Sequence, residues 1–94
     1  MISGNFEISV KAKNDLRGIW KYTIETWSLN QARRYYNLIF DEINYVSSNF
    51  DLARKVDYVR SGYRISKVKS HLIFYKKQKS GVILIVRILH QQMT

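Results

Sequence analysis

The chain has 94 residues, enough for one domain with a single core, and 46% of them are hydrophobic, which excludes a disordered protein. It has no cysteine and only two histidines, which excludes disulfides and cysteine catalysis and argues against a histidine-rich metal site. The net charge is +9, and residues 51–94 carry ten basic side chains against two acidic ones. This imbalance favours a polyanionic or acidic partner for the C-terminal half, although a solvated basic surface also explains it.

The sequence lacks the signals that direct a protein to a membrane. Its longest apolar run, Val82 to Val86, is far shorter than the ~20 residues that a membrane-spanning helix needs. The first residues, "MISGNFEISV", lack the basic and apolar blocks of a signal peptide. We therefore expect a single domain spanning residues 1–94 that stays in the cytoplasm and holds no metal or cofactor.

The N-terminal third predicts a short strand and a helix. Apolar and polar residues alternate from Phe6 to Val10, as in a strand. Asp15 follows near the start of the helix, where negative charge suits the helix dipole, and either Ser9 or Asn14 can be the N-cap. The apolar stripe of this helix has the spacing of one helical face and consists of Leu16, Ile19, Trp20, Thr23, Ile24 and Trp27.

A second helix follows with almost no loop. Ser28 and Gln31 have the spacing of a capping box, and the helix should end between Ser47 and Asn49. Its apolar side consists of Ala32, Tyr35, Tyr36, Ile39, Ile43 and Val46. Two helices with so short a connection must form an antiparallel hairpin. The next segment, "DLARKVDYV", predicts an irregular or short helical link.

Three strands are predicted in the C-terminal third. The segments "GYRISKV", "SHLIFYK" and "VILIVRILH" are rich in β-branched and aromatic residues, and the charged "KKQKSG" is a turn. The last strand is apolar on both faces except for Arg87, which indicates a central strand. The fold class is therefore α+β, with a short N-terminal strand, an antiparallel helix hairpin and a three-stranded antiparallel sheet. The hairpin can cover only one face of this sheet.

Three segments together point to a known family. They are "AKNDLRGIWKYTIETWSLNQARRYY", "SGYRISKVKSHLIFYK" and "VRILHQQM", and in this order and spacing the chain resembles the ParE toxins of the RelE/ParE superfamily. The resemblance extends from Phe6 to Met93 and implies a RelE/ParE-like fold. The link from Asn49 to Asp57 departs from the pattern, because relatives have a turn with Pro or Gly there.

The resemblance also implies partners. ParE toxins act on DNA gyrase and are held inactive by a ParD-type antitoxin, so a hetero-oligomer with the antitoxin is expected. An acidic, amphipathic antitoxin tail that folds on binding would suit a basic protein with an apolar groove. The residues expected to bind the antitoxin are Leu16, Trp20, Trp27 and Tyr35, with Tyr35 more exposed than Tyr36. The two tryptophans can instead belong to the core.

A second set of residues is expected to face the target. We expect Arg87 on the open side of the sheet, near Arg60 and Arg64, although it can also reach solvent or bond backbone carbonyls. His71 and His90 can pack at the sheet edge or meet across neighbouring strands. The full target-binding set is Arg60, Arg64, His71, Arg87, His90 and Met93.

Catalysis is not expected, but an alternative remains. RelE-like relatives cleave messenger RNA on the ribosome, and Arg64 and Arg87 stand where two of their arginines would stand. Their C-terminal tyrosine has no counterpart here, whereas His90 is a protonatable group nearby. A non-toxic nucleic-acid-binding module and a toxin that has lost its activity are further alternatives. Ser70 and His71 are adjacent on a strand and so cannot form a hydrolase pair.

Overall fold

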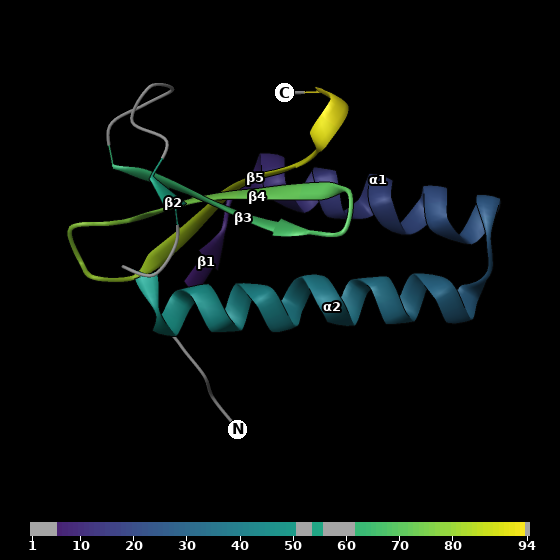
Figure 1. Cartoon of the computed structure of the whole chain (residues 1–94), viewed down its shortest axis with the longest axis horizontal. Coiled ribbons are helices and arrows are strands. Elements are labelled where there is room, and N and C mark those ends of the chain that lie inside the picture. The colour runs from purple at the N-terminus through teal and green to yellow at the C-terminus, as the bar shows by residue number, and fades with distance from the viewer. Residues whose placement is uncertain (1–5, 51–53, 56–61, 94) are drawn as a thin grey trace.

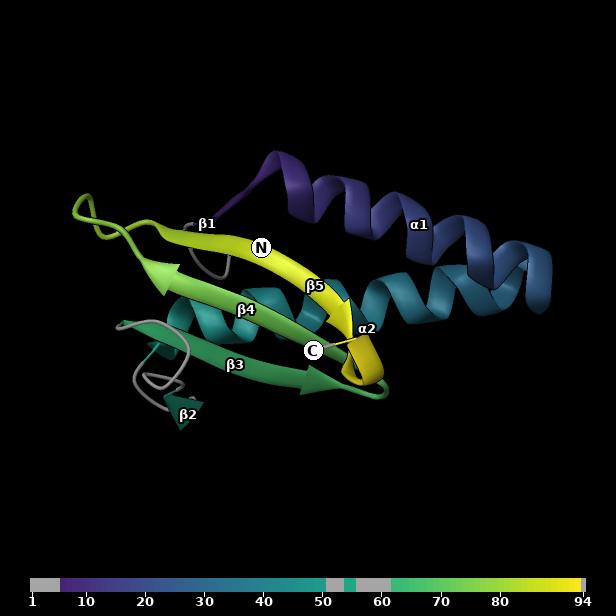
Figure 2. The ribbon, with the colours of Figure 1, turned by 90° about the horizontal axis from the view of Figure 1, so that it is seen from above.

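The computed structural model describes residues 6–50, 54–55 and 62–93. Its elements are β1 Phe6–Ile8, α1 Val10–Thr26, α2 Leu29–Ser48, β2 Arg54–Lys55, β3 Tyr63–Val68, β4 His71–Lys77, β5 Ile83–His90 and a short 3-10 helix, Gln91–Met93. The strands form one sheet in the order β1-β5-β4-β3-β2. Helix α2 lies across one face of this sheet, and α1 runs beside β5 (Figures 1 and 2). The predicted α+β class and the helix hairpin are confirmed.

Two serines begin the two helices. Ser9 is the N-cap of α1, because its Oγ accepts a hydrogen bond from the Ala12 N–H at 3.0 Å. The same hydroxyl donates to the Val86 carbonyl at 2.8 Å, which ties the start of α1 to β5. Ser28 caps α2 by accepting from the Gln31 N–H at 3.0 Å, so the predicted cap is confirmed.

The pairing of the sheet differs from the prediction of three antiparallel strands. β1 joins the sheet parallel to β5, with Phe6 opposite Ile83. β2, Arg54–Lys55, adds a fifth strand antiparallel to β3, where an irregular or helical link was expected. The other residues of this link, 51–53 and 56–59, lie outside the described residues. The helix hairpin and strands β2 to β4 all lie between β1 and β5 in the sequence, so local patterns do not reveal this parallel pair.

A β-bulge at Val86 changes the two faces of β5. The register between β4 and β5 shifts there, so Val86 has no residue opposite it. As a result, Ile85 and Ile88, three positions apart, are both buried. The bulge therefore points Arg87 away from the face on which Ile85 and Ile88 are buried.

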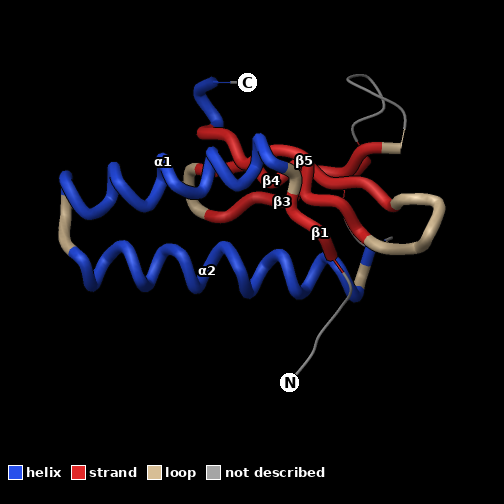
Figure 3. The backbone as a smooth tube through the Cα atoms, turned by 180° about the vertical axis from the view of Figure 1, so that it is seen from behind, coloured by secondary structure: helices blue, strands red, loops and turns tan. Residues whose placement is uncertain are grey.

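The helix hairpin is longer than the sheet that it covers. Its joined end extends past the ends of the strands, as the view from behind shows (Figure 3). The predicted apolar stripe of α1 is therefore buried only in part: Leu16 is 4% exposed, whereas Trp27 is 69% exposed. The possibility that Trp27 belongs to the core is thus wrong, and an apolar surface remains at the tip of the hairpin.

Candidate functional site

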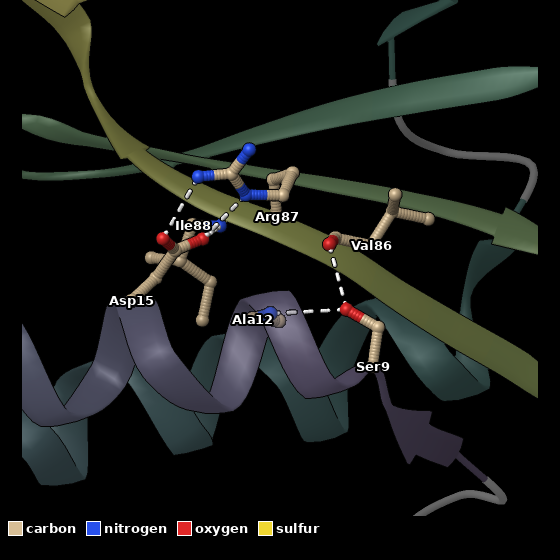
Figure 4. A network of polar contacts seen from close by, with 6 residues as sticks. All are labelled: Ser9, Ala12, Asp15, Val86, Arg87 and Ile88. Carbon is tan, nitrogen blue, oxygen red and sulfur yellow. Dashed lines mark hydrogen bonds and ion pairs between the residues drawn. The ribbon is translucent and has the colours of Figure 1, made fainter.

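The charged residue inside the last strand, Arg87, is bound to Asp15 of α1 (Figure 4). Arg87 Nε donates to Asp15 Oδ2 at 2.8 Å, and Arg87 Nη2 donates to Asp15 Oδ1 at 3.0 Å. The backbone N–H of Ile88 donates to the same carboxylate at 2.9 Å. Hydrogen bonding to Asp15 raises the pKa of Arg87 above its ordinary value. Asp15, expected to favour the helix dipole, instead joins α1 to β5.

Arg64 lies on the other face of the sheet from Arg87. It is opposite Tyr75 on β4, whereas Arg87 is opposite the neighbouring Phe74, and neighbouring strand residues point to opposite faces. Arg64 is 8% exposed, and its guanidinium carbon lies 4.5 Å from the centroid of the Phe50 ring. The prediction that Arg87 lies near Arg64 on an open cationic surface is therefore wrong.

Two other members of the predicted target-binding set cannot be placed fully. Arg60 lies outside the described residues. The backbone of Met93 ends the short 3-10 helix, but its side chain is not described. The described arginines of the set are thus both engaged within the protein, one in an ion pair and one against an aromatic ring.

The two histidines meet where β4 begins and β5 ends. His71 is paired with His90 in the register of these strands, and their ring centroids lie 5.3 Å apart. The Tyr35 hydroxyl of α2 lies 2.5 Å from His71 Nδ1 and donates to the Val68 carbonyl at 3.1 Å. The backbone N–H of Gln92 donates to His90 Nδ1 at 3.2 Å. The alternative in which the two histidines meet across neighbouring strands is confirmed.

Burial controls the protonation of this cluster. It lowers the pKa of His71, and the neighbouring His90 lowers it further, whereas Asp15 raises it. Burial also raises the pKa of the Tyr35 hydroxyl. Hydrogen bonding with Ser70 lowers this pKa, but by less. Near neutral pH the His71 imidazole and the Tyr35 phenol are therefore both uncharged.

Two grooves run along opposite sides of α1. The first has a volume of about 680 Å³, and we call it the basic groove; it is lined by Ile8, Lys13, Leu16, Arg17, Trp20, Arg33, Tyr36, Asn37 and Phe40. The second has a volume of about 720 Å³, and we call it the histidine groove; it is lined by Asn14, Asp15, Gly18, Ile19, Tyr22, Thr23, Trp27, Gln31, Tyr35, Ser70, His71, Arg87, Ile88, Leu89 and His90. None of the described residues lines both grooves.

The basic groove has an aromatic wall between the two helices. The ring centroids of Trp20 and Tyr36 lie 5.2 Å apart, and those of Tyr36 and Phe40 lie 5.0 Å apart. Edge-to-face and tilted contacts of this kind contribute about 0.5–1.5 kcal/mol each beyond the burial of apolar area. The three rings therefore form a continuous apolar wall in the groove.

Three cations border this aromatic wall. Lys13 and Arg17 come from α1 and Arg33 comes from α2, and none of the described residues that line the basic groove is acidic. A helix with one apolar face and acidic flanks would bury apolar area on the rings and pair its carboxylates with these cations. The geometry of the basic groove thus suits an acidic amphipathic segment.

The residues expected to bind an antitoxin are divided between the grooves. Leu16 and Trp20 line the basic groove, and Trp27 and Tyr35 line the histidine groove. Tyr35 and Tyr36 are both half-buried, and the greater exposure expected for Tyr35 stays a prediction. The other described residues of the basic groove were not predicted to bind a partner; they are Ile8, Lys13, Arg17, Arg33, Tyr36, Asn37 and Phe40. The helical spacing of Arg33, Tyr36 and Phe40 was the signal that could have found these three.

Two classes of site are absent from the described part of the chain. Residues 6–50, 54–55 and 62–93 contain no group of three or more His, Cys, Asp or Glu side chains that could hold a metal ion. No helix among them is long and apolar enough to cross a membrane.

Comparisons with known proteins point to one family. The sequence model of the ParE toxin of type II toxin–antitoxin systems, parDE, matches residues 6–94. Toxin ParE1 of Mycobacterium tuberculosis is 34% identical over 92 residues, which cover 98% of this chain and 94% of that protein. Toxin ParE1 of Caulobacter vibrioides is 33% identical over 89 residues, which cover 94% of this chain and 90% of that protein.

The fold agrees with a solved structure. A chain from the chromosomal ParDE TA system of P. aeruginosa superposes with a TM-score of 0.78, covering 96% of this chain and 98% of that one. The two sequences are 15% identical, so this likeness concerns the fold alone.

Proposed function

Because the chain belongs to the ParE toxin family of type II toxin–antitoxin systems, we propose that it inhibits DNA gyrase by binding and is neutralised by a ParD-type antitoxin. It acts in the cytoplasm, where its target works, and forms a hetero-oligomer with the antitoxin. The toxin performs no catalysis of its own.

The basic groove supports the antitoxin part of this proposal. Its aromatic wall, Trp20, Tyr36 and Phe40, shares the groove with three cations, and the described lining contains no carboxylate. An acidic antitoxin tail that is disordered when free would fold as a helix against this wall. The charge of +9 on the toxin speeds the encounter of the two proteins.

A ribosome-dependent ribonuclease is the second candidate, and the His71–His90 pair is the observation that favours it. Cleavage of a phosphodiester needs a base, an acid and a cation that stabilises the charge on the phosphate. The two imidazoles could serve as base and acid, but Arg87 in the same groove is already neutralised by Asp15. The described residues that line the histidine groove therefore supply no free lysine or arginine for the phosphate.

Two assays on the purified toxin without antitoxin test the proposal. One measures gyrase supercoiling and detects cleaved DNA, and the other measures cleavage of messenger RNA on ribosomes. We expect inhibition of gyrase and intact RNA. RNA cleavage with unaffected gyrase, lost in a His90→Ala variant, would establish the ribonuclease instead. A toxin that does neither and binds any DNA with a steep salt dependence would be a nucleic-acid-binding module.

A further inference from the structure

The histidine groove carries an inference that rests on the proposed function. It lies on the opposite side of α1 from the basic groove and shares none of the described lining residues with it. Its volume of about 720 Å³ is in the range of grooves that hold a ligand or a peptide segment. An antitoxin tail bound in the basic groove therefore leaves the histidine groove free to bind a different partner.

The charges in the histidine groove cancel. Among the described residues that line it, Asp15 and Arg87 are the only carboxylate and the only arginine, and they neutralise each other in the ion pair; none of these residues is a lysine. His71 is uncharged near neutral pH because burial lowers its pKa. In a protein of charge +9, the described lining of this groove thus offers no lysine and no unpaired arginine, which suits neither a phosphate backbone nor an acidic helix.

Exposed aromatic side chains stand along the same groove. Trp27 is 69% exposed and Tyr22 is 64% exposed, although both line the histidine groove. Large aromatic side chains at the edge of a groove are the residues that most often anchor a protein partner. The apolar side chains of Ile19 and Leu89 lie in the same groove and extend the surface that a partner could bury.

A glycine, Gly18, lines the histidine groove and contributes no side chain to it. Gly18 lies in the middle of α1, where glycine is less favourable than any residue except proline. A Cβ added there would meet no atom within 4 Å, so packing within the chain does not require a glycine. On the helix surface, residue 18 lies between Asp15 and Tyr22, and a larger side chain would project into the groove. The missing side chain keeps room for a segment that approaches α1 closely.

We propose that the histidine groove is the surface that binds gyrase, and that it takes an uncharged, apolar segment of the gyrase protein rather than the DNA backbone. Trp27 is the anchor of this contact, and the bare helix surface at Gly18 receives the segment. The basic groove serves the antitoxin independently. Binding to gyrase then depends weakly on salt, whereas binding to the antitoxin depends on it strongly.

Four variants test this assignment in supercoiling assays with the gyrase holoenzyme and in binding to gyrase without DNA. Gly18→Leu fills the groove, and Gly18→Ala is its control, because both substitutions favour the helix but only leucine projects into the groove. Trp27→Ala removes the anchor. Tyr45→Ala is the control for loss of an exposed aromatic side chain, since Tyr45 is exposed on α2 and lines neither groove.

We expect Gly18→Leu and Trp27→Ala to weaken gyrase inhibition about tenfold or more, with Gly18→Ala and Tyr45→Ala equal to the wild type. Affinity of Gly18→Leu for the antitoxin should stay at the wild-type value. Two results would overturn the assignment and leave the proposed function intact. One is that Gly18→Leu inhibits gyrase as strongly as the wild type. The other is that binding of the toxin to gyrase requires DNA and weakens steeply as the salt concentration rises. A wild-type toxin that neither binds nor inhibits gyrase would overturn the proposed function and this assignment with it.

Discussion

Asp15 on α1 and Arg87 on β5, 72 residues apart in the sequence, form a two-point ion pair that fastens the helix hairpin to the sheet. The Asp15 carboxylate also accepts the backbone N–H of Ile88, next to the bulge at Val86. The Asp15 carboxylate therefore accepts hydrogen bonds both from the Arg87 guanidinium and from a backbone N–H, at the point where the pairing of β5 with β4 is irregular. Arg87 is in this sense a structural residue, and it shapes the histidine groove without carrying a free charge into it.

Replacing Asp15 with alanine should destabilise the protein. The substitution leaves the Ile88 N–H without its acceptor and Arg87 without its partner, so the free energy of unfolding should fall by about 1–3 kcal/mol. Urea unfolding followed by circular dichroism measures this change. Asn14→Ala is the control, because Asn14 is exposed one position away, and its loss should change stability by less than ~0.5 kcal/mol. Equal effects of the two variants would contradict a structural role for the ion pair.

The stability of the fold should fall in mild acid because of His71. Burial places the pKa of His71 in the folded state below its ordinary value of 6.5, so the unfolded chain binds the proton first as the pH falls. The contribution of His71 is complete above about pH 6.5 and is lost as the pH falls through the lowered pKa. Urea unfolding at a series of pH values from neutral to about 5 should show this decline. A His71→Asn variant should show a smaller decline, and an unchanged slope would assign the effect to other groups.

Tyr75 should cause a second loss of stability in alkali. Its side chain is fully buried, and burial and the nearby Glu42 raise its pKa from 10.0 to about 12. The unfolded chain therefore loses the proton first, and stability should decline as the pH rises above about 10. The Tyr75 hydroxyl has no hydrogen-bond partner in the described residues, so Tyr75→Phe should change stability at neutral pH by less than ~1 kcal/mol and should reduce the alkaline decline. A large loss of stability in this variant at neutral pH would reveal a partner for the hydroxyl.

The neighbouring residues Arg33 and Arg34 provide a matched test of the basic groove. Only Arg33 lines the groove, whereas Arg34 is exposed beside it on α2. Arg33→Glu places a negative charge against an acidic tail and should weaken antitoxin binding about tenfold, a loss of ~1.4 kcal/mol. Arg34→Glu should have a much smaller effect. Titration calorimetry at low and high salt measures both, and equal losses in the two variants would show that net charge, not the groove, decides the affinity.

Much of the fold follows from patterns within short segments of the sequence. The spacing of Ser28 and Gln31 predicts the start of α2, and the short connection before it predicts the hairpin. The alternation in the last strands predicts their existence and order along the chain. These features depend on neighbouring residues and on a periodicity of two or 3.6, so each can be recognised before the chain is folded.

The site depended on contacts that no local pattern encodes. The sequence alone left open whether the two histidines meet, and it did not indicate that Arg87 would be neutralised by Asp15 or that Arg64 would be buried against Phe50. The bulge at Val86 and the parallel pairing of β1 with β5 decide which side chains face α1, and both arise when distant segments are packed together. The sequence by itself determined the elements, their order and the excess of positive charge. Only the tertiary structure decided which of those charges remain unpaired at a groove, because the partner that neutralises a charge, such as Asp15 for Arg87, comes from a distant part of the sequence.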